Sequence, residues 1–324
     1  MKALRIHGGR IDLAATCYPD APPPWLDLST GINPCPWSTH PVPTVDLQRL
    51  PSPDAIRDLE AAAAAMFGAD ADRVVALPGS EIGLRALDIL DLPSPVRFVT
   101  PSYSTHADAI AGAVPIPRDA IDTIRDGTLL LANPNNPDGD LDAPERLLRI
   151  VRRGTWLVVD EAFADIAPEF SLVPHLAGDD RAIVFRSFGK FFGLAGVRLG
   201  FMIAPLAQAE ALRRRLGSWP VSALAVAYGT AAYRDTAWIA HARRSIIARA
   251  DRLDALLERH GLQGRGACAL FRLVESDDAP AIFERLARAG ILTRQFDHAP
   301  RWLRFGVPGE DSAFERLDRA LGDG

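Results

Sequence analysis

The sequence predicts an α/β protein, with a large domain whose mostly parallel sheet is sandwiched by helices and a smaller α+β domain at the carboxyl end. Two observations support this fold class. Between residues 74 and 203, short apolar runs alternate with helical patterns, which is typical of a parallel sheet covered on both faces. After residue 205 the chain becomes strongly helical and then ends in a mixture of short strands and helices.

The elements of the large domain follow in chain order. Residues 1–55 are irregular and rich in proline, so we expect an arm or a set of loops without a packed helix. A helix is expected over 56–67, with Asp54 as its N-cap and Gly68 at its end. Short apolar runs predict strands over 74–77, 96–100, 129–132, 156–160, 183–186 and 199–203, with helices over about 82–90, 104–112 and 143–152.

The remainder of the chain predicts the smaller domain. Residues 206–216 and 222–260 have helical composition, and strand-like segments follow at 268–274, 291–296 and 302–307. Helices are expected over 279–289 and from about 310. We therefore divide the chain into an amino-terminal arm over 1–45 that joins the small domain and the active site, a large domain over 46–215 and a small domain over 216–324.

Composition and charge exclude several classes of protein. The 324 residues carry 36 Lys and Arg against 41 Asp and Glu, a net charge of −5 without a basic cluster, which argues against nucleic-acid binding. No apolar stretch reaches the roughly 18–20 residues of a membrane span, and the amino end lacks the apolar run of a signal peptide. Three widely spaced cysteines, and histidines without metal-ligand spacing, predict a cytoplasmic protein without disulfides or a metal site.

Lysine is almost absent from the chain. Only Lys2 and Lys190 are lysines, so chemistry that needs an interior lysine amine has one candidate. Lys190 follows the apolar run 183–186, where burial favours the neutral amine that attacks carbonyls and forms Schiff bases. The alternative interpretation is a lysine whose ammonium reaches solvent from a loop.

Other polar residues also follow predicted strands. Gly79 and Ser80 stand between a strand and a helix, an arrangement that binds phosphate but also caps helices. Asp160 ends a buried strand at the edge where α/β proteins bind ligands, although an aspartate there can also cap the next turn. Arg198 together with Ser187 has the chemistry to hold a phosphate; alone, Arg198 would indicate a surface ion pair.

Two further features complete the set. The segment NPNNPDG at 133–139 predicts a rigid turn whose Asn side chains remain available as donors. Tyr103 follows the strand over 96–100 and has a ring that could stack on a planar ligand, or pack in the core. A planar, cationic, phosphorylated aldehyde needs all of these groups at once. Pyridoxal 5′-phosphate (PLP) is such a cofactor.

The motifs NPNNPDG, VVDEAF, SFGKFFGLAGVRLGF and WLRFGVP resemble fold-type I PLP enzymes of the aspartate aminotransferase superfamily over nearly the whole chain. The most similar branch contains histidinol-phosphate aminotransferase and the threonine-phosphate decarboxylase of cobalamin biosynthesis. The resemblance implies the PLP-dependent transferase fold and a homodimer. It also implies the site residues: Lys190 forms the Schiff base, Asp160 pairs with the ring nitrogen, Asn136 binds the ring oxygen, Tyr103 stacks, and Gly79, Ser80, Glu81 (through its backbone), Ser187 and Arg198 bind the phosphate.

The amino end and the DEAF segment resemble the decarboxylase more than the aminotransferase. Phe163 stands where aminotransferases of this group usually have a tyrosine. The amino-terminal HGGRID and STGINP segments resemble the substrate-binding arm of the decarboxylase, although such an arm is also explained as a strap across the dimer. The substrate residues implied are His7, Gly8 and Arg10 at the substrate phosphate, Gly31 and Asn33 near the substrate, and Arg304 at its carboxylate.

We therefore expect a small phosphorylated amino acid as substrate, and decarboxylation of O-phospho-L-threonine to (R)-1-amino-2-propanol phosphate as the reaction. The alternative is transamination of histidinol phosphate or a related amino acid. A third possibility is a protein of this fold without catalysis, acting as a regulator or an assembly partner. One departure concerns Leu50, which stands where relatives supply a tyrosine from the neighbouring subunit, and which would leave the cofactor phosphate one hydrogen bond fewer.

Overall fold

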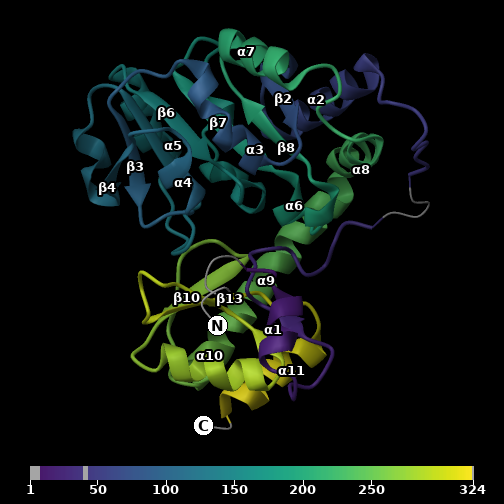
Figure 1. The fold of residues 1–324 in the computed structure, drawn as a ribbon, viewed down its shortest axis with the longest axis vertical. Helices are drawn as coiled ribbons and strands as arrows, with labels where there is room; N and C mark the ends of the chain where they lie inside the picture. The colour runs from purple at the N-terminus through teal and green to yellow at the C-terminus, as the bar shows by residue number, and fades with distance from the viewer. Residues whose placement is uncertain (1–7, 39–42, 323–324) are drawn as a thin grey trace. The chain divides into compact units, whose positions relative to one another are not determined.

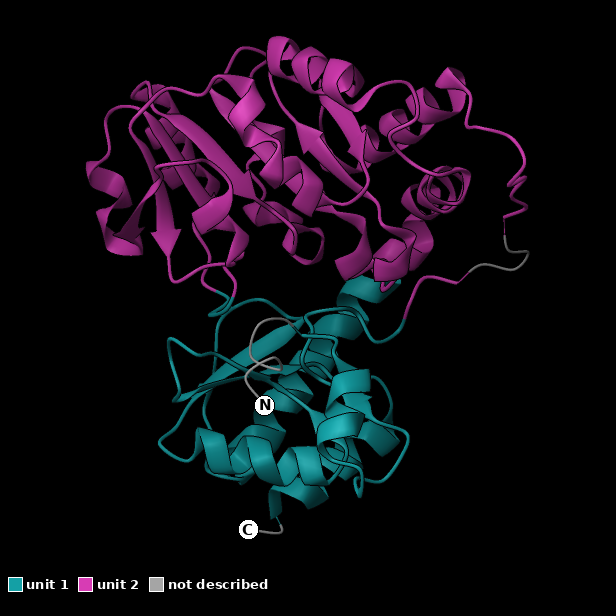
Figure 2. Ribbon diagram, viewed as in Figure 1, with its two compact units in different colours: residues 1–35, 137–139, 241–324 teal, residues 36–136, 140–240 magenta. Residues whose placement is uncertain are grey.

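The structure is a computed structural model that describes residues 8–38 and 43–322. The chain forms two compact units, coloured separately in Figure 2. Unit 2 comprises residues 36–136 and 140–240, and unit 1 comprises residues 1–35, 137–139 and 241–324. This division differs from the expected one, which ended the arm at residue 45 and began the small domain at residue 216. Residues 216–240 group with unit 2 because helix α8 (Ala223–Arg234) packs against helix α2 (Pro53–Phe67).

Unit 2 is built on a seven-stranded sheet with the order β2-β8-β7-β6-β5-β3-β4 (Figure 1). Strand β8 is antiparallel to both of its neighbours, β2 and β7, whereas the run from β7 to β4 is parallel. The carboxyl ends of the parallel strands therefore meet at one edge of the sheet. The strands are β2 Val74–Leu77, β3 Val96–Thr100, β4 Val114–Pro117, β5 Thr128–Ala132, β6 Trp156–Asp160, β7 Ala182–Ser187 and β8 Gly200–Ile203.

Helices cover both faces of this sheet. One face contributes alternate strand residues, among them Val75, Leu130 and Phe185, to a buried core that includes Leu212 of α7. On the other face, Phe201 packs edge-on against the aromatic rings of α2 and α8. The α-helices are α2, α3 Ser80–Arg85, α4 Thr105–Asp108, α5 Pro144–Arg152, α6 Phe188–Phe191, α7 Leu206–Leu216, α8 and α9 Thr236–Arg259, with 3₁₀ turns at Ala71–Arg73, Leu87–Leu90, Arg118–Thr123, Ala164–Ile166, Pro168–Phe170, Val173–His175 and Ala195–Val197.

Unit 1 contains an antiparallel sheet in the order β12-β13-β10-β9 and a two-stranded parallel pair of β1 with β11. Its amphipathic helices α10 and α11 bury their apolar faces, so the unit has its own core. The elements are α1 Ile11–Cys17, β1 Leu26–Asp27, β9 Gly264–Arg265, β10 Phe271–Glu275, α10 Ala279–Arg288, β11 Ile291–Leu292, β12 Arg294–Gln295, β13 Trp302–Gly306 and α11 Asp311–Gly322. Most of α9, from residue 241 onward, also belongs to unit 1.

Three local expectations were wrong. The amino-terminal region contains a packed helix, α1, because prolines begin only at Pro19 and Ala14 is buried. Helix α2 starts at Pro53, since the Ser52 side chain rather than Asp54 caps it by accepting from the Ala55 N–H. Strand β4 was missed because its sequence, VPIP, contains two prolines and is tolerated only at the sheet edge.

Within the part of the chain that the structure describes, we find no helix whose length and apolar character would allow it to cross a lipid bilayer.

Candidate active site

A cavity of about 220 Å³ opens in unit 2, where the carboxyl ends of the parallel strands meet. It contains polar groups from five separate segments of the chain. The structure brings together here all nine residues that the sequence suggested for the cofactor: Gly79, Ser80, Glu81, Tyr103, Asn136, Asp160, Ser187, Lys190 and Arg198. The convergence follows from the topology, since each segment leaves the sheet at the same edge.

Gly79 and Arg198 form one wall of the cavity. Gly79 has a φ of +95°, and a Cβ atom built on it would lie only 2.9 Å from Nη2 of Arg198. The absence of a side chain therefore lets the guanidinium approach the loop backbone. Ser187 pairs with Gly200 across the sheet, and a Cβ on Gly200 would lie 2.4 Å from the backbone nitrogen of Ser80. These two glycines create a narrow cradle of hydroxyl, backbone N–H and guanidinium groups, which suits an anion.

Lys190 is held by the aromatic core around it. It lies on the single turn α6, between the fully buried Phe188 and Phe191. Phe188 also stacks on Phe192 with ring centroids 4.7 Å apart. The Lys190 Nζ lies 5.8 Å from the ring centroid of Phe163, which also lines the cavity. The amine is therefore presented to the cavity from a rigid support.

Asp160 has a buried partner that the sequence did not reveal. Its Oδ1 accepts from the Ala162 N–H at 3.1 Å, and its Oδ2 lies 3.3 Å from Nε2 of His106. His106 is fully buried, and its Nδ1 has no hydrogen-bond partner among the described residues. A histidine three residues after Tyr103 was the available signal, but nothing local indicates that it faces Asp160. The contact fixes the orientation of the carboxylate.

Tyr103 is oriented by Glu81. The Tyr103 hydroxyl donates to Glu81 Oε2 at 2.8 Å, and the same carboxylate accepts from Thr105 and Arg85. Burial and the Glu81 hydrogen bond raise the pKa of Tyr103 to about 12. Burial alone would raise the pKa of Glu81, but the three hydrogen bonds outweigh it and the pKa is lowered. We expected Glu81 to contribute only its backbone; the structure also gives its side chain a role in placing the aromatic ring.

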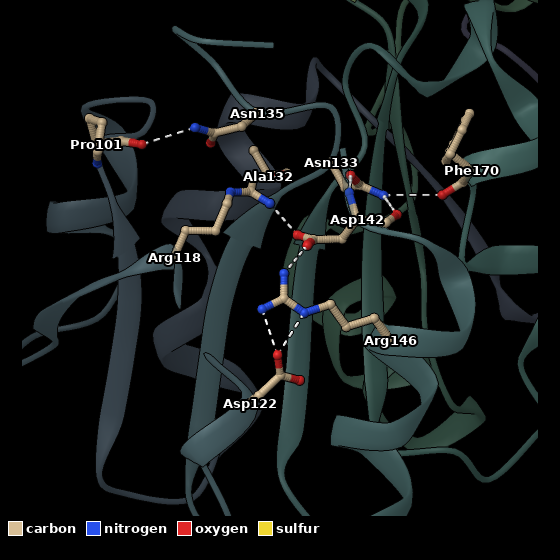
Figure 3. Close-up of polar contacts among 9 residues, drawn as sticks. All are labelled: Pro101, Arg118, Asp122, Ala132, Asn133, Asn135, Asp142, Arg146 and Phe170. Atoms are coloured by element: carbon tan, nitrogen blue, oxygen red, sulfur yellow. Dashed lines mark hydrogen bonds and ion pairs between the residues drawn. The ribbon is translucent and has the colours of Figure 1, made fainter. Parts of the chain in front are cut away.

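The three asparagines of the NPNNPDG segment have different positions, and Figure 3 shows the contacts of the first two, Asn133 and Asn135. Asn133 is fully buried and bonds to both backbone groups of Asp142, while Nδ2 of Asn135 donates to the carbonyl of Pro101 at 3.0 Å. Asn136 lines the cavity. The first two asparagines therefore hold the loop, and the third is presented to the site.

A buried ion cluster is formed by residues that neighbour Asp160 and Ser187 in the chain. Arg186, next to Ser187, donates to Glu161 at 2.7 Å and forms an ion pair with Asp165, and all three side chains are at most 2% exposed. Glu161 itself follows Asp160 in the chain. The cluster therefore ties the end of β6 to the end of β7, and the sequence pattern gave no indication of it.

The predicted substrate residues all belong to unit 1. Arg304 on β13 is buried, donates to the carbonyl of Ser29 at 2.9 Å and lies over the ring of Phe271. A Cβ on Gly8 would lie 2.4 Å from the same Ser29 carbonyl oxygen, so these two candidates meet at Ser29.

The other substrate candidates of this arm are less closely grouped. Asn33 is buried, and its Oδ1 accepts from the Cys35 N–H at 3.0 Å, which is a turn contact. Gly31 is buried, whereas Arg10 is exposed at the start of α1. His7 lies outside the described residues.

Arg294 is a second arginine beside Arg304 that the sequence analysis did not select. The two residues are direct cross-strand partners in the β12–β13 pair. Burial and the neighbouring charge of Arg294 lower the pKa of Arg304 to about 10, so the Arg304 guanidinium remains charged at neutral pH. Two adjacent positive charges favour a ligand with more than one negative charge.

Sequence relatives cover nearly the whole chain. Threonine-phosphate decarboxylase from Pseudomonas aeruginosa is 41% identical over 97% of this chain and 96% of its own length. Threonine-phosphate decarboxylase from a Sinorhizobium species is 40% identical, over 99% and 98%. Histidinol-phosphate aminotransferase 1 from Bordetella parapertussis is 30% identical, over 92% of each chain.

Solved structures agree with this fold. Histidinol-phosphate aminotransferase from Clostridium acetobutylicum has a TM-score of 0.80 at 20% identity, covering 92% of this chain and 98% of its own. L-Threonine-O-3-phosphate decarboxylase from Porphyromonas gingivalis has a TM-score of 0.76 at 19% identity, with the same coverage. The model of the family "Aminotransferase class I and II" matches residues 25–321. The chain therefore belongs to the aminotransferase class I and II family.

Proposed function

We propose that the protein is a PLP-dependent decarboxylase that converts O-phospho-L-threonine to (R)-1-amino-2-propanol phosphate in cobalamin biosynthesis. The observation that carries the proposal is the 41% identity to a threonine-phosphate decarboxylase over 97% of the chain, against 30% for the histidinol-phosphate aminotransferase. Solved structures of an aminotransferase and of a decarboxylase both match this fold, so the fold does not distinguish the two activities. The higher sequence identity therefore favours the decarboxylase.

The residues of the cavity fit PLP. The cradle at Gly79, which a Cβ atom would fill, provides room and positive charge for the phosphate, with Ser80, Ser187 and Arg198 as its donors. Asp160 has the charge that would pair with a protonated ring nitrogen, and Lys190 has the amine that would hold the aldehyde covalently. Asn136 would donate to the ring oxygen, and Tyr103 would stack on the ring.

When bound, PLP accepts the electron pair that remains on Cα after one of its bonds breaks. In decarboxylation the bond from Cα to the carboxylate carbon breaks, CO₂ leaves, and a proton is added at Cα. Lys190 Nζ is the group that would deliver this proton from the cavity wall. Asp160, oriented by His106, would hold the proton on the ring nitrogen. Tyr103 keeps its own proton at neutral pH because its pKa is about 12, so it acts through its ring.

Phe163 supports the choice of reaction. It lines the cavity but carries no hydroxyl, so it adds no donor for the ring oxygen and leaves that task to Asn136. Aminotransferases of the group that the sequence resembles usually have tyrosine at this position. The loss of this donor is consistent with a different reaction at Cα.

The substrate would be held by unit 1. Arg304 would bind its carboxylate, and the cross-strand neighbour Arg294 would supply a second positive charge for a substrate that also carries a phosphate. Gly8 meets Ser29 beside Arg304, which supports a role of the arm near the substrate.

The protein would act as a homodimer in the cytoplasm. Leu50 is 64% exposed and Leu47 is 76% exposed in the single chain, which suits a segment that is covered by a second copy. Because leucine cannot donate a hydrogen bond, the partner would contribute apolar contact at Leu50 rather than a phosphate ligand.

A decarboxylation assay tests this function. The purified protein, loaded with PLP, should release CO₂ from O-phospho-L-threonine without any 2-oxo acid. The alternative, histidinol-phosphate transamination, requires 2-oxoglutarate as the amino acceptor, so turnover that appears only with that acceptor would contradict decarboxylation. PLP binding without turnover of either substrate would favour the non-catalytic alternative.

Lysine variants test the cofactor assignment. Lys190→Ala should abolish the visible absorption band of bound PLP and lower the rate by about 10⁴-fold or more, as removal of a covalent catalytic group does. Lys2→Ala makes the same change at the other lysine and should leave both the absorption band and the rate unchanged. An unaltered band in Lys190→Ala would exclude Lys190 as the Schiff-base residue.

A further inference from the structure

The loop that carries Asn136 is closed at its base by buried side chains (Figure 3). It runs from the end of β5 to the start of α5. Asn133 Nδ2 donates to the carbonyl oxygens of Asp142 at 3.0 Å and of Phe170 at 3.1 Å, and Asn133 Oδ1 accepts from the Asp142 N–H at 2.8 Å. Asn133 and Asp142 stand at opposite ends of the loop, so these bonds bring its two ends together.

Arg118 joins the same two ends through its guanidinium. The Asp142 side chain is 2% exposed, and one of its carboxylate oxygens forms an ion pair with Arg118 Nη1. Arg118 Nη2 donates to the carbonyl of Ala132, the last residue of β5, at 2.8 Å. The planar fork of one guanidinium therefore links the residue that precedes the loop to the residue that closes it.

Arg146 holds the other oxygen of Asp142 at 2.6 Å, but its remaining contacts lead away from the loop. Its Nε and Nη2 donate to Asp122 at 2.9 and 2.6 Å. If Arg118 were removed, Asp142 would keep the positive charge of Arg146. The chain should therefore tolerate loss of Arg118 better than loss of both arginines, which would leave a buried carboxylate uncompensated.

The tip of this loop belongs to the other compact unit. Residues 137–139 group with unit 1, where the Gly139 carbonyl accepts from the Ala267 N–H at 2.9 Å. Residues up to Asn136 and from Asp140 onward group with unit 2. Asn136 is thus the last residue before the chain enters unit 1. Its place in the cavity depends on how firmly the base of the loop is attached to unit 2.

We propose that Arg118 and Asp142 are positioning residues for Asn136. They fix the base of the loop to the end of β5, so that the Asn136 amide meets the ring oxygen of PLP independently of the tip. This inference rests on the proposed function, because it requires PLP in the cavity of unit 2. A merely stabilising ion pair would lower the folding stability without acting through Asn136.

The first test compares Arg118→Met with Arg97→Met. Arg97, near the start of β3, also pairs with an aspartate, Asp126, and is therefore the matched control. Arg118→Met should raise the dissociation constant of PLP about ten-fold, as loss of a supporting contact does at other sites. It should also shift the pH at which the visible band of bound PLP changes, in the direction produced by Asn136→Ala. Arg97→Met should do neither, and equal effects of the two variants would overturn the proposal.

A double-mutant cycle separates positioning from general stability. In an Asn136→Ala background, Arg118→Met should cause no further change in the PLP dissociation constant, because both substitutions act on one contact. The same fold-change in both backgrounds would overturn the proposal. Should Arg118→Met not fold, Arg118→Lys keeps the charge but loses the fork, and should weaken PLP binding to a smaller extent through the same cycle.

Hydrogen exchange of the cofactor-free protein gives a readout without PLP. Amides of residues 133–142 should exchange faster in Arg118→Met than in the wild type. Their exchange rates in Arg97→Met should equal those of the wild type. Unaltered protection of the loop would contradict the proposal. A wild-type protein that does not bind PLP would instead refute the proposed function, while the exchange result would still report whether Arg118 holds the loop.

Discussion

The hydroxyl of Tyr103 donates to Glu81 Oε2 at 2.8 Å, so a carboxylate beside the Gly-Ser loop fixes the aromatic ring of the cavity. The ring is therefore in position before any ligand arrives. Thr105 and Arg85 donate to the same carboxylate, which keeps Glu81 oriented if the tyrosine hydroxyl is lost. This arrangement separates the contribution of the ring from that of the hydroxyl.

Tyr103→Phe should lower the free energy of unfolding by about 1 kcal/mol, the usual contribution of such a hydrogen bond. PLP affinity should fall only a few-fold because the ring remains, whereas Tyr103→Ala should lower it much further. Denaturation of the cofactor-free protein and PLP titration measure the two effects. Tyr18→Phe is the matched control, since Tyr18 donates to Glu284 at 2.6 Å in unit 1. A loss of PLP affinity in Tyr18→Phe as large as in Tyr103→Phe would contradict a local role.

The stability that this hydrogen bond provides should depend on pH. The pKa of Glu81 is lowered in the folded protein, so its contribution is present above the ordinary glutamate pKa of about 4.3 and is lost as the pH falls through the folded value. The pKa of Tyr103 is raised to about 12, so its contribution is lost as the pH rises from the ordinary value of about 10 toward 12. The stability difference between wild type and Tyr103→Phe should therefore be largest between these limits. If the stability difference between the two proteins did not depend on pH, the Tyr103–Glu81 hydrogen bond would not be its source.

His106 should act on PLP through Asp160. His106→Phe keeps a buried aromatic ring but removes the 3.3 Å contact, so Asp160 should hold the ring-nitrogen proton less firmly. We expect kcat to fall about ten-fold, as for other supporting residues, and the pH dependence of the visible band to shift.

His260→Phe is the control for this change, because His260 lies 2.7 Å from Asp318 in unit 1. It should alter neither kcat nor the spectrum. An unchanged spectrum in His106→Phe, with reduced stability alone, would mean that His106 is only a core residue.

The sequence could predict that the nine candidate cofactor residues lie together, because they follow strands of one parallel sheet. Asp160 and Ser187 end strands of one sheet, and Asn136 lies in the loop after a third, so parallel pairing brings them to one edge whatever the details of packing. The supporting residues were not predictable in this way. His106 faces Asp160 through a contact between segments that are distant in sequence. Arg304 faces Arg294 because of the register between strands β12 and β13, which the sequence pattern does not reveal.

Two elements of the fold were missed for local reasons. Strand β4 is the edge strand of the sheet, so its two prolines, which have no N–H to donate, are tolerated there. The sequence does not reveal which strand lies at the edge. Helix α1 has seven residues, and the Tyr18 hydroxyl at its end bonds to Glu284 of α10, so tertiary contact stabilises a helix too short to form alone.

Arg186→Met should strongly destabilise the protein. Glu161 and Asp165 would lose their buried positive partner, and uncompensated buried charge costs about 3–5 kcal/mol. Urea denaturation of the cofactor-free protein measures this loss. Arg234→Met is the matched control, since Arg234 pairs with Asp58 on the surface and should contribute about 1 kcal/mol or less. A similar loss in both variants would mean that the buried cluster does not stabilise the ends of β6 and β7.

Arg294 should affect two properties of the site. These are the affinity for a doubly anionic substrate and the pH range over which Arg304 stays charged. Arg294→Met removes a positive charge beside Arg304, so the KM for O-phospho-L-threonine should rise about 10- to 100-fold, the effect expected from losing a hydrogen bond to a charged group. Arg265→Met, a change on β9 of the same sheet, where Arg265 lies over Trp302, should leave KM unchanged.

The pH profile gives a second and independent measurement. In the wild type, KM should rise as the pH approaches about 10, because burial and the charge of Arg294 lower the pKa of Arg304 to that value and a neutral guanidine binds anions weakly. Arg294→Met removes one of these two causes, so the alkaline rise of KM should move to higher pH even though KM at neutral pH is larger. An alkaline rise that moves to lower pH, or stays in place, would show that Arg294 does not act on Arg304 through its charge.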